Sequence, residues 1–270
     1  MLSQYSHTVP DCTAGHARGA AALTVTWAGC EDEVRAAQQL RYRIFGGELG
    51  ARLPGPARES GLDADRFDPF CDHLLVHAAS ATGQPLLVGT YRVLAPDGAR
   101  RAGGFYSDAE FDLAPLRALR PRALELGRSC VHPDYRNGGV ILALWSALGR
   151  YMLQRRLETM IGCASISLAG GPEAATAIWE SLHPRYLAAP CWQVRARHPL
   201  ELGAPRVPTA EPTARFAPDT PPLIKGYLRC GAMLLGPPAL DRAFNTADLP
   251  IMLRLDDLAP RYRKHFLGQH

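Results

Sequence analysis

The sequence predicts an α+β protein with a central, mostly antiparallel sheet flanked by helices. The order of elements supports this class: after one short strand comes a helix, then several antiparallel strands, and only then a strand that leads into a helix. A doubly wound nucleotide-binding fold would alternate strands and helices throughout, so we do not expect one. The length of 270 residues suits one large unit, or one unit with a C-terminal extension.

The first elements follow a polar arm. Residues 1–22 are polar, rich in Gly and Ala and without a period, so we expect a flexible N-terminal arm. Apolar residues alternate with threonine over 23–27, which is typical of a strand with one buried face. Asp32 can cap a helix that reaches Phe45, and a loop rich in Gly and Pro follows over 46–61.

A hairpin and the clearest helix come next. Apolar runs at 74–76 and 86–94 flank a turn that contains Gly and Pro, which indicates two antiparallel strands. A further strand is expected over 124–131. Beyond it, apolar residues between Ile141 and Met152 recur at helical spacing, so this strand leads into an amphipathic helix.

The rest of the chain predicts further elements and a break. In order, these are a strand at 160–166, a helix from about Pro172, a strand through Trp192 and Val194, a Pro-dense break at 199–222, an apolar run at 223–235, a strand at 251–255, and a terminal helix with Leu258, Tyr262 and Phe266. We therefore divide the chain into the arm (1–22), a core (23–198), and a Pro-rich connection with a C-terminal extension packed on that core (199–270).

The composition excludes several classes of protein. The net charge of +4 is too small to indicate a nucleic-acid partner, although nearly all the basic residues are arginines, which suit phosphate and carboxylate. The seven cysteines are scattered without a C-x-x-C pair, so we expect neither a metal site nor a disulfide framework, and a reducing cytoplasm. No apolar stretch approaches the roughly 20 residues that cross a bilayer, so any membrane attachment would be peripheral.

One segment can hold a phosphate. Over 125–141 a strand ends at Val131, and Gly138 and Gly139 precede the amphipathic helix. Backbone N–H groups at the positive end of a helix dipole bind anions. Glycines at such a junction also serve the turn alone, and neither G-x-G-x-x-G nor G-x-x-x-x-G-K-[ST] is present, so the spacing by itself leaves both interpretations open.

The same segment resembles a known family. Residues 131–139, Val-His-Pro-Asp-Tyr-Arg-Asn-Gly-Gly, are similar to the V-x-P-x-[YF]-R-x-x-G junction of GCN5-related N-acyltransferases. The resemblance implies their fold, and a loop that binds the phosphate end of an acyl carrier. The residues that it assigns to the acyl donor are Val131, Arg136, Asn137, Gly138 and Gly139. Ile141 replaces a usually small residue, which disfavours tight coenzyme A binding and favours a pantetheine arm.

Further segments narrow the resemblance. Four of them resemble acyl-homoserine-lactone synthases: Arg41-x-x-x-Phe45, Asp65-Arg66-Phe67-Asp68, Gly89-Thr90-Tyr91-Arg92 and Glu125-Leu126-Gly127-Arg128. Four are more similar to the ornithine N-acyltransferases of ornithine-lipid synthesis: residues 67–76, 124–131, 221–229 and 241–248. These motifs occur in the expected order between roughly Val25 and Phe266, so together they are more specific than any one of them.

The resemblance implies a reaction. A 3-hydroxyacyl group would pass from acyl carrier protein to the α-amine of L-ornithine and give lyso-ornithine lipid. The phosphopantetheine of the carrier would be the donor arm, without a tightly bound cofactor or a metal. We expect a cytoplasmic protein with possible peripheral contact to anionic lipid at the inner face of the membrane, and no nucleic acid as partner.

Three other functions remain open. One is a quorum-signal synthase of the acyl-homoserine-lactone type, although the long extension beyond Trp192 disfavours it by resemblance. Another is an acyltransferase that uses glutamine, lysine or glycine as acceptor. A third is a non-catalytic protein that has kept the fold and binds acyl carrier protein or membranes.

The chemistry assigns roles to two residues on one strand. Amide formation from a thioester needs a positioned carbonyl, stabilisation of the oxyanion and a route for the amine's proton. Glu125 is the candidate general base, directly or through water; a carboxylate paired with Arg128 is the alternative, and both roles can coexist. Three residues apart on a regular strand, these side chains point to opposite faces. A shared site therefore requires a β-bulge near Gly127 and a splayed opening in the sheet for the thioester arm.

The acceptor suggests further residues. The substrate-binding candidates are Arg41, Phe45, Asp65, Asp68, Asp72, His73 and Arg92. Either Arg92 or Arg128 would clamp the amino-acid carboxylate, while one of the three aspartates would receive the distal ammonium. Acidic loop residues are more often turn formers. His73 is either a proton relay or a structural residue at the start of a strand.

Two basic regions are candidates for docking the carrier protein or a lipid surface. Arg261, Lys264 and His265 surround the apolar stripe of the terminal helix, whose simplest role is packing on the core. Basic residues of the first helix, Arg35, Arg41 and Arg43, are the rival docking region.

Overall fold

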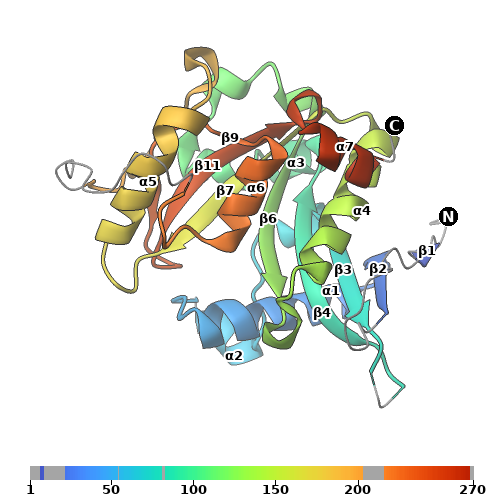
Figure 1. The fold of residues 1–270 in the computed structure, drawn as a ribbon. Helices are drawn as coiled ribbons and strands as arrows, with labels where there is room; N and C mark the ends of the chain where they lie inside the picture. Colours follow the sequence, from blue (N-terminus) through green and yellow to red (C-terminus); the bar gives the residue numbers. More distant parts are fainter. Residues whose placement is uncertain (1–6, 9–21, 54, 81–82, 203–215, 268–270) are drawn as a thin grey trace.

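The computed structural model confirms the α+β class (Figure 1). It describes residues 7–8, 22–53, 55–80, 83–202 and 216–267. Within these residues the main sheet has the order β1-β2-β3-β4-β6-β7-β11-β10, and β9 also pairs with β11. Its strands are β1 (His7–Thr8), β2 (Leu23–Trp27), β3 (Asp72–Ala78), β4 (Leu86–Leu94), β6 (Ala123–Val131), β7 (Thr159–Ser167), β9 (Met233–Leu234), β10 (Ala239–Asp241) and β11 (Thr246–Arg254).

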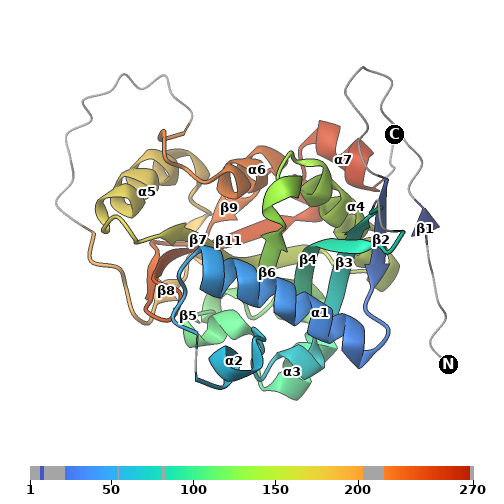
Figure 2. The same ribbon diagram turned by 90° about the horizontal axis from the view of Figure 1, so that it is seen from below.

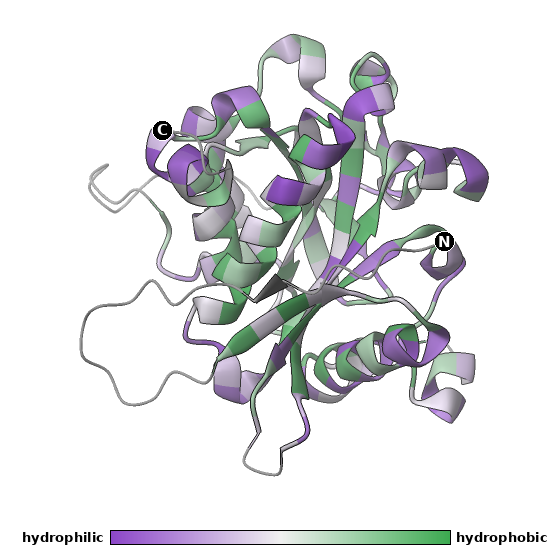
Figure 3. Cartoon of the chain, turned by 90° about the vertical axis from the view of Figure 1, so that its right-hand side faces the viewer, coloured by the Kyte–Doolittle hydropathy of each residue, from purple (hydrophilic) through white to green (hydrophobic). Residues whose placement is uncertain are grey.

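Helices cover both faces of this sheet, as Figure 2 shows. One face carries α1 (Glu31–Tyr42), which continues as a π-helix over Arg43–Glu48, α2 (Gly55–Ser60) and α3 (Pro96–Ala102). The other face carries α4 (Gly139–Arg155), α5 (Glu173–Tyr186), α6 (Pro222–Cys230) and α7 (Pro260–Leu267). In Figure 3, apolar residues recur along the strands in the middle of the molecule, and hydrophilic residues lie mainly on the outer helices.

The amphipathic helix predicted after β6 is α4, and its spacing explains its packing. Val140, Leu144, Leu148 and Met152 recur every four residues and are all buried in the core that α4 shares with β2, β3 and β4. The buried apolar residues of α5 pack in the same way, in a second apolar cluster that includes residues of α6, β7 and β11. Because α4 and α5 lie on the same face of the sheet, these two clusters bury that face.

The sheet opens at its centre between β6 and β7. These two strands run parallel and pair from Ala123↔Thr159 to Leu126↔Gly162, and then they separate. The last paired position needs glycine, because a Cβ on Gly162 would lie 2.5 Å from the carbonyl oxygen of Leu126. Beyond it β7 continues to pair with β11, which confirms the splayed opening expected from the sequence.

A β-bulge lies on β6 beside this opening. Thr90 of β4 pairs with Cys130, and Arg92 pairs with Gly127, so β6 has one residue more than β4 between these two pairs. Arg128, inside this interval, has a φ of 52°, in the left-handed region. The bulge predicted near Gly127 is confirmed.

The C-terminal segment completes the sheet rather than packing on a finished core. β11 pairs with β7 along its whole length, from Thr246↔Ser167 to Arg254↔Thr159. The sheet therefore continues across the division that we expected at residues 198 and 199. Most of the expected arm, and residues 203–215 of the Pro-rich connection, lie outside the described residues.

One predicted strand is wrong. Trp192 ends a 3-10 turn over Pro190–Trp192, and Val194 follows it outside any strand. The two-residue strand β8 (Arg195–Ala196) comes after it and pairs with β5 (Phe111–Asp112). A buried side chain in a turn can mimic the alternation of a short strand, and Pro190 favours the turn.

We predict that Gly162→Ala lowers the free energy of unfolding by about 1–3 kcal/mol, because the new Cβ would collide with backbone that cannot rotate away. Urea unfolding followed by circular dichroism measures the change. The exposed Gly170 has no atom within 4 Å of an added Cβ, so Gly170→Ala should stay within about 0.5 kcal/mol of the wild type. Equal effects of the two substitutions would contradict a tight approach of β6 and β7.

Candidate active site

A cavity of about 250 Å³ lies where β6 separates from β7. Strands β4 and β6 supply Arg92, Glu125 and Arg128 to its wall, and Tyr106 and Ser107 add the turn that follows α3. The π-helix and the segment before β3 add Phe45 and Phe67, β7 and α6 add further residues, and the β10–β11 region completes the wall. The cavity is therefore assembled from segments that lie far apart in the chain.

The bulge brings Glu125 and Arg128 to the same cavity, but the two side chains do not pair. Both line the cavity wall. The guanidinium of Arg128 lies 3.4 Å from the carboxylate of Asp63 and 3.3 Å from that of Asp65. The expected alternative, an ion pair between Glu125 and Arg128, is therefore wrong.

Glu125 is held by the neighbouring turn. Oε1 accepts hydrogen bonds from the backbone N–H of Ser107, at 2.8 Å, and from its hydroxyl; Oε2 accepts one from the N–H of Tyr106, at 2.5 Å. The side chain is 4% exposed, and burial raises the pKa of its carboxyl against the opposing effect of these bonds. Since each oxygen can accept two hydrogen bonds, Oε2 retains capacity for one more.

Next to the cavity is a buried ionic network of three arginines and three aspartates. Its members are Arg41, Arg92, Arg128, Asp63, Asp65 and Asp68. Arg41 contacts Asp63 at 2.9 Å and Asp68 at 2.8 Å, and Arg92 contacts Asp65 at 2.7 Å and Asp68 at 3.4 Å. Arg128 completes the network through its two longer contacts. Three positive charges therefore face three negative charges, and the network is formally neutral.

This network changes the expected roles of three residues. Asp65 and Asp68 are occupied by arginines, so they do not offer free negative charge to a substrate ammonium. Burial disfavours the ionised form of Asp65, but the neighbouring Arg92 and Arg128 lower the pKa of its carboxyl below the ordinary value. Arg92 is held by both aspartates and is a poor clamp for a substrate carboxylate.

Three other candidates lie away from the cavity wall. Asp72 accepts a hydrogen bond from Tyr151 at 2.5 Å and pairs with Arg155 at 3.4 Å, so its position does not fit the role expected for it. Arg41 is completely buried inside the network. His73 lies next to Arg41, and burial together with that guanidinium lowers the pKa of its imidazole, which favours the structural role over a proton relay.

An acidic group that the sequence analysis missed lies on the opposite wall. One ligand atom each of Glu110, Cys163 and Asp248 lies within 4.8 Å of the others, and Asp241 is close by. Burial, reinforced by the neighbouring carboxylates, raises the pKa of both Glu110 and Asp248. Among the described residues, no basic side chain forms an ion pair with Glu110, Asp241 or Asp248. Asp241 and Asp248 lie in the 241–248 motif, whereas nothing in the sequence pointed to Glu110.

A chain of hydrogen bonds joins this acidic group to Glu125. The Ser107 hydroxyl, bonded to Glu125, lies 3.4 Å from the thiol of Cys163, and that thiol donates to Glu110 at 3.1 Å. Burial raises the pKa of the Cys163 thiol, so it keeps its proton. The acidic group can receive a cation, either an ammonium or, after loss of that proton, a metal ion.

The expected donor loop forms the start of α4. Gly138 has a φ of 95°, and the Asn137 side chain accepts a hydrogen bond from the backbone N–H of Gly139 at 3.1 Å. Gly89 of β4 lets the helix approach, because a Cβ there would lie 2.4 Å from Val140. The positive end of a 17-residue helix therefore points to the end of β6.

Arg136 fastens this junction to the π-helix. Its guanidinium forms an ion pair with Glu48 through both terminal nitrogens, one of them at 2.8 Å. Its Nε donates to the carbonyl of Val131 at 3.0 Å. Arg136 thus holds the π-helix beside the end of β6, and its side chain remains 43% exposed.

Aromatic rings complete the cavity wall. Phe45 of the π-helix packs edge-on against Phe244, with ring centroids 5.9 Å apart. The Arg128 guanidinium lies 4.5 Å from the ring centroid of Phe244 and 4.9 Å from that of Tyr106. These contacts hold Arg128 by cation–π attraction at the cavity surface.

Comparison with known proteins identifies relatives of this chain. Residues 40–146 match the acetyltransferase (GNAT) domain family. An L-ornithine N(alpha)-acyltransferase of Agrobacterium fabrum is 41% identical over 88% of this chain and 83% of its own length. Proteins with the same name from Brucella abortus and Rhodobacter capsulatus are 39% and 40% identical, over 90% and 87% of this chain and 88% and 90% of their own lengths.

Solved structures with low sequence identity share the fold. The acyl-homoserine-lactone (AHL) synthase LasI has a TM-score of 0.50 and 12% identity, and the comparison covers 92% of this chain and 96% of LasI. FeeM, an N-acyl amino acid synthase from uncultured soil microbes, has a TM-score of 0.50 and 13% identity, with 91% and 94% covered. These likenesses support the architecture of the sheet.

We predict that Arg41→Ala lowers the free energy of unfolding by about 3–5 kcal/mol, because it leaves buried carboxylates without a counter-charge. Chemical unfolding measures the loss. The exposed Arg43 lies two residues away in the chain, so Arg43→Ala should change the free energy by less than about 0.5 kcal/mol. Similar losses for both would show that the network contributes little.

In contrast to the ionic network, the acidic group should lower the stability of the protein, by an amount that depends on pH. Burial raises the pKa of Glu110 to about 8, above its ordinary value of 4.5. The folded protein keeps a proton that the unfolded chain loses, so this stabilisation is complete below the ordinary pKa and is lost as the pH rises through about 8. Glu110→Gln avoids that loss, and it should gain at least about 1 kcal/mol relative to the wild type between about pH 5 and about pH 9.

Urea unfolding across this pH range tests the prediction. The exposed Glu59 provides the control, because Glu59→Gln should differ from the wild type by the same amount at every pH. A difference for Glu110→Gln that does not vary with pH would show that Glu110 ionises normally.

Proposed function

This chain belongs to the family of the L-ornithine N(alpha)-acyltransferases, and we propose that it transfers a 3-hydroxyacyl group from acyl carrier protein to the α-amine of L-ornithine. The observation that carries the proposal is the cavity at the separation of β6 and β7. It combines a buried carboxylate with acidic side chains that form no ion pair with a basic residue of the described chain.

The separated strands offer a place for the donor. Beyond Leu126 and Gly162 the facing edges of β6 and β7 no longer pair with each other, so the amide groups of a pantetheine arm can take the place of a strand there. The start of α4 lies at the outer end of this opening, where its first N–H groups can bind the phosphate of the arm. The thioester then reaches the bulge on β6.

The bulge suits the reacting carbonyl. A bulge leaves one residue outside the regular ladder, so a backbone N–H of Arg128 or Ser129 is our candidate for binding the oxyanion. Attack by the uncharged α-amine forms the C–N bond, and collapse of the tetrahedral intermediate breaks the C–S bond. The amine's proton moves to the base and then to the departing thiolate, which leaves as the free thiol.

Glu125 is the proposed base. Its Oε2 can accept one further hydrogen bond, and its raised pKa makes the carboxylate a stronger base than an exposed glutamate. The hydrogen bonds from Tyr106 and Ser107 fix the carboxylate in one orientation. It can act directly or through one water molecule.

The acceptor fits between Arg128 and the acidic group. Arg128 lies at the cavity surface, and its contacts to Asp63 and Asp65 are long, so it can also bind the amino-acid carboxylate. Asp248, with Glu110 behind it, offers negative charge to the distal ammonium of ornithine. This assignment replaces the aspartates that the sequence analysis favoured.

The product is amphipathic, with an acyl chain on an amino acid that keeps its carboxylate and distal ammonium, so we also propose peripheral contact with the inner membrane face from the cytoplasm. Arg261 and Lys264 of α7 are exposed and can contact anionic lipid. In the described part of the chain, no helix has the length and apolarity needed to span a bilayer.

We predict that the purified protein, given 3-hydroxyacyl carrier protein and a panel of amino acids, forms N-acylated ornithine, detected by mass spectrometry. Norvaline has the same carbon chain without the distal ammonium, and it should react at least about 10-fold less efficiently because it leaves the acidic group unpaired. Glu125→Gln should lower kcat about 100-fold or more while carrier-protein affinity is retained.

Other results would redirect the proposal. An unchanged pH profile and kcat in a folded Glu125→Gln protein would remove Glu125 as base. A product with S-adenosylmethionine but not with ornithine would indicate a lactone synthase. No product with any acceptor would favour a protein that only binds the carrier.

A further inference from the structure

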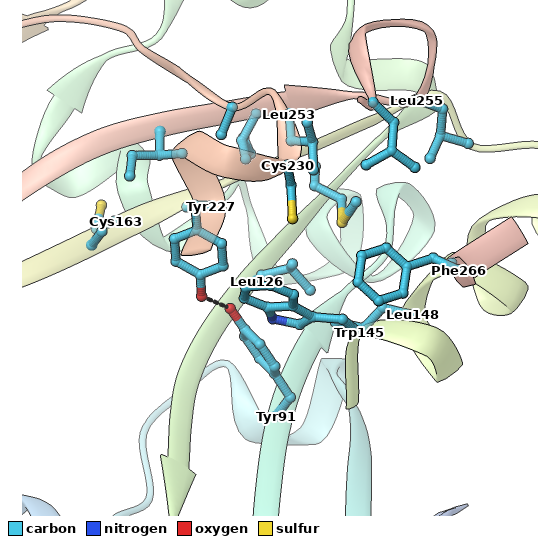
Figure 4. Close-up of a pocket in the computed structure, with 18 residues that line it drawn as sticks. Tyr91, Leu126, Trp145, Leu148, Cys163, Tyr227, Cys230, Leu253, Leu255 and Phe266 are labelled. Carbon is cyan, nitrogen blue, oxygen red and sulfur yellow. Dashed lines mark hydrogen bonds between the residues drawn. The ribbon is translucent and has the colours of Figure 1, made fainter. Parts of the chain in front are cut away.

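A second, apolar cavity lies behind the candidate active site (Figure 4). It is enclosed by α4, α6 and α7 together with β6, β7 and β11. Residues deep inside it are apolar, among them Leu148, Leu253, Leu258 and Phe266. We call this space the acyl chamber.

The acyl chamber adjoins the active-site cavity, because the two spaces share part of their lining. The residues that line both spaces are Tyr91, Leu126, Cys163, Ala164 and Tyr227. Leu126 belongs to the last residue pair that joins β6 to β7, so the passage lies where the two strands separate. These shared residues form the boundary that an acyl chain must cross to pass from the thioester position into the chamber.

The passage is not uniformly apolar. The hydroxyls of Tyr91 and Tyr227 form a hydrogen bond there, and Figure 4 shows them meeting beside the indole of Trp145. The indole is stacked on the Tyr227 ring with centroids 5.3 Å apart. Its buried Nε1–H has no hydrogen-bond partner among the described residues.

The neighbouring helix is shaped to hold this indole. A Cβ on Gly226 would lie 2.7 Å from Cη2 of Trp145, so only glycine allows α6 to lie this close. Gly226 and Tyr227 belong to the 221–229 motif singled out in the sequence, to which the proposed reaction gives no other role. The motif therefore places Tyr227 and Trp145 together at the passage.

An unpaired donor in this position needs an explanation. Leaving a buried N–H without an acceptor costs about 1–3 kcal/mol, and phenylalanine would fill an apolar passage without that cost. Burial raises the pKa of Tyr91 to about 12, so its hydroxyl is neutral and can donate as well as accept. The passage thus offers one free donor and two adaptable hydroxyls to a ligand that is otherwise apolar.

We infer that Trp145, Tyr91 and Tyr227 bind a hydroxyl on the acyl chain near its thioester end, and so select 3-hydroxyacyl donors over unsubstituted ones. The inference rests on the proposed function. Tyr91 lies opposite the bulge on β6 where the thioester is placed, and C3 is only two carbons from the carbonyl. The substrate hydroxyl accepts from Nε1 of Trp145 and donates to a tyrosine oxygen, while the rest of the chain enters the acyl chamber.

The test compares donors that differ in this hydroxyl alone. Carrier proteins loaded with a 3-hydroxyacyl chain or with the unsubstituted chain of the same length are given to the protein with ornithine. The wild type should favour the hydroxylated donor by at least about 10-fold in kcat/KM. In Trp145→Phe and Tyr227→Phe this ratio should fall to within about 3-fold of unity, because either change removes a hydrogen bond to the hydroxyl.

Matched controls separate this effect from general damage. Trp27 and Tyr151 lie outside both cavities, so Trp27→Phe and Tyr151→Phe should keep the wild-type ratio. Circular dichroism establishes that each variant is folded. Equal efficiency of both donors in the wild type, or a ratio unchanged in both Trp145→Phe and Tyr227→Phe, would overturn the inference.

A binding measurement keeps this test separate from that of the proposed function. Free 3-hydroxymyristate and myristate are titrated into the protein, and the hydroxylated acid should bind at least about 5-fold more tightly to the wild type but not to Trp145→Phe. Preferential binding without acylated ornithine would support the inference and contradict the proposed function. Acylated ornithine formed equally from both donors would contradict the inference and support transfer of an acyl group to ornithine.

Discussion

The structure depends on the burial of three arginines and three aspartates at charge balance. Arg41 comes from α1, Arg92 from β4 and Arg128 from β6, while the aspartates come from the single segment that precedes β3. Each buried guanidinium would be costly alone, so the segment must dock where all three can be paired. Docking in turn fixes the face of the sheet on which the cavity opens. Beside the cavity, the paired charges of this network therefore occupy the place of packed apolar side chains, which would close the cavity.

Charge is distributed unevenly around the cavity as a result. On one wall the arginines are matched, and the charge that Arg128 presents is shared with Asp63 and Asp65. On the other wall Glu110 and Asp248 lie close together without an ion pair to a described basic residue, and burial destabilises their ionised forms. A substrate with a carboxylate at one end and an ammonium at the other would match this polarity. The stability lost at the acidic wall is consistent with a site kept for binding rather than for folding.

The regular elements were more predictable than the site. The apolar run at 86–94 matches β4, and the helical period between Ile141 and Met152 identified α4, although this helix extends beyond it at both ends. The spacing of Glu125 and Arg128 required the bulge that the structure contains. Side-chain partners could not be predicted this way, because pairing of Asp65 and Asp68 with arginines depends on contacts between distant segments. Glu110 lies between short turns without a period, and only the fold brings it to Cys163. Local pattern predicts elements, whereas charge partners follow from tertiary structure.

The position of β11 has a consequence for biosynthesis. This strand borders β7 at the centre of the molecule, although it is made long after β7, and its neighbour α6 carries Tyr227. A nascent chain that has emerged from the ribosome only as far as β7 therefore lacks one wall of its pocket. Binding competence arises only when residues 222–254 have left the exit tunnel and inserted beside β7. The order of synthesis thus delays activity until this later segment has been made.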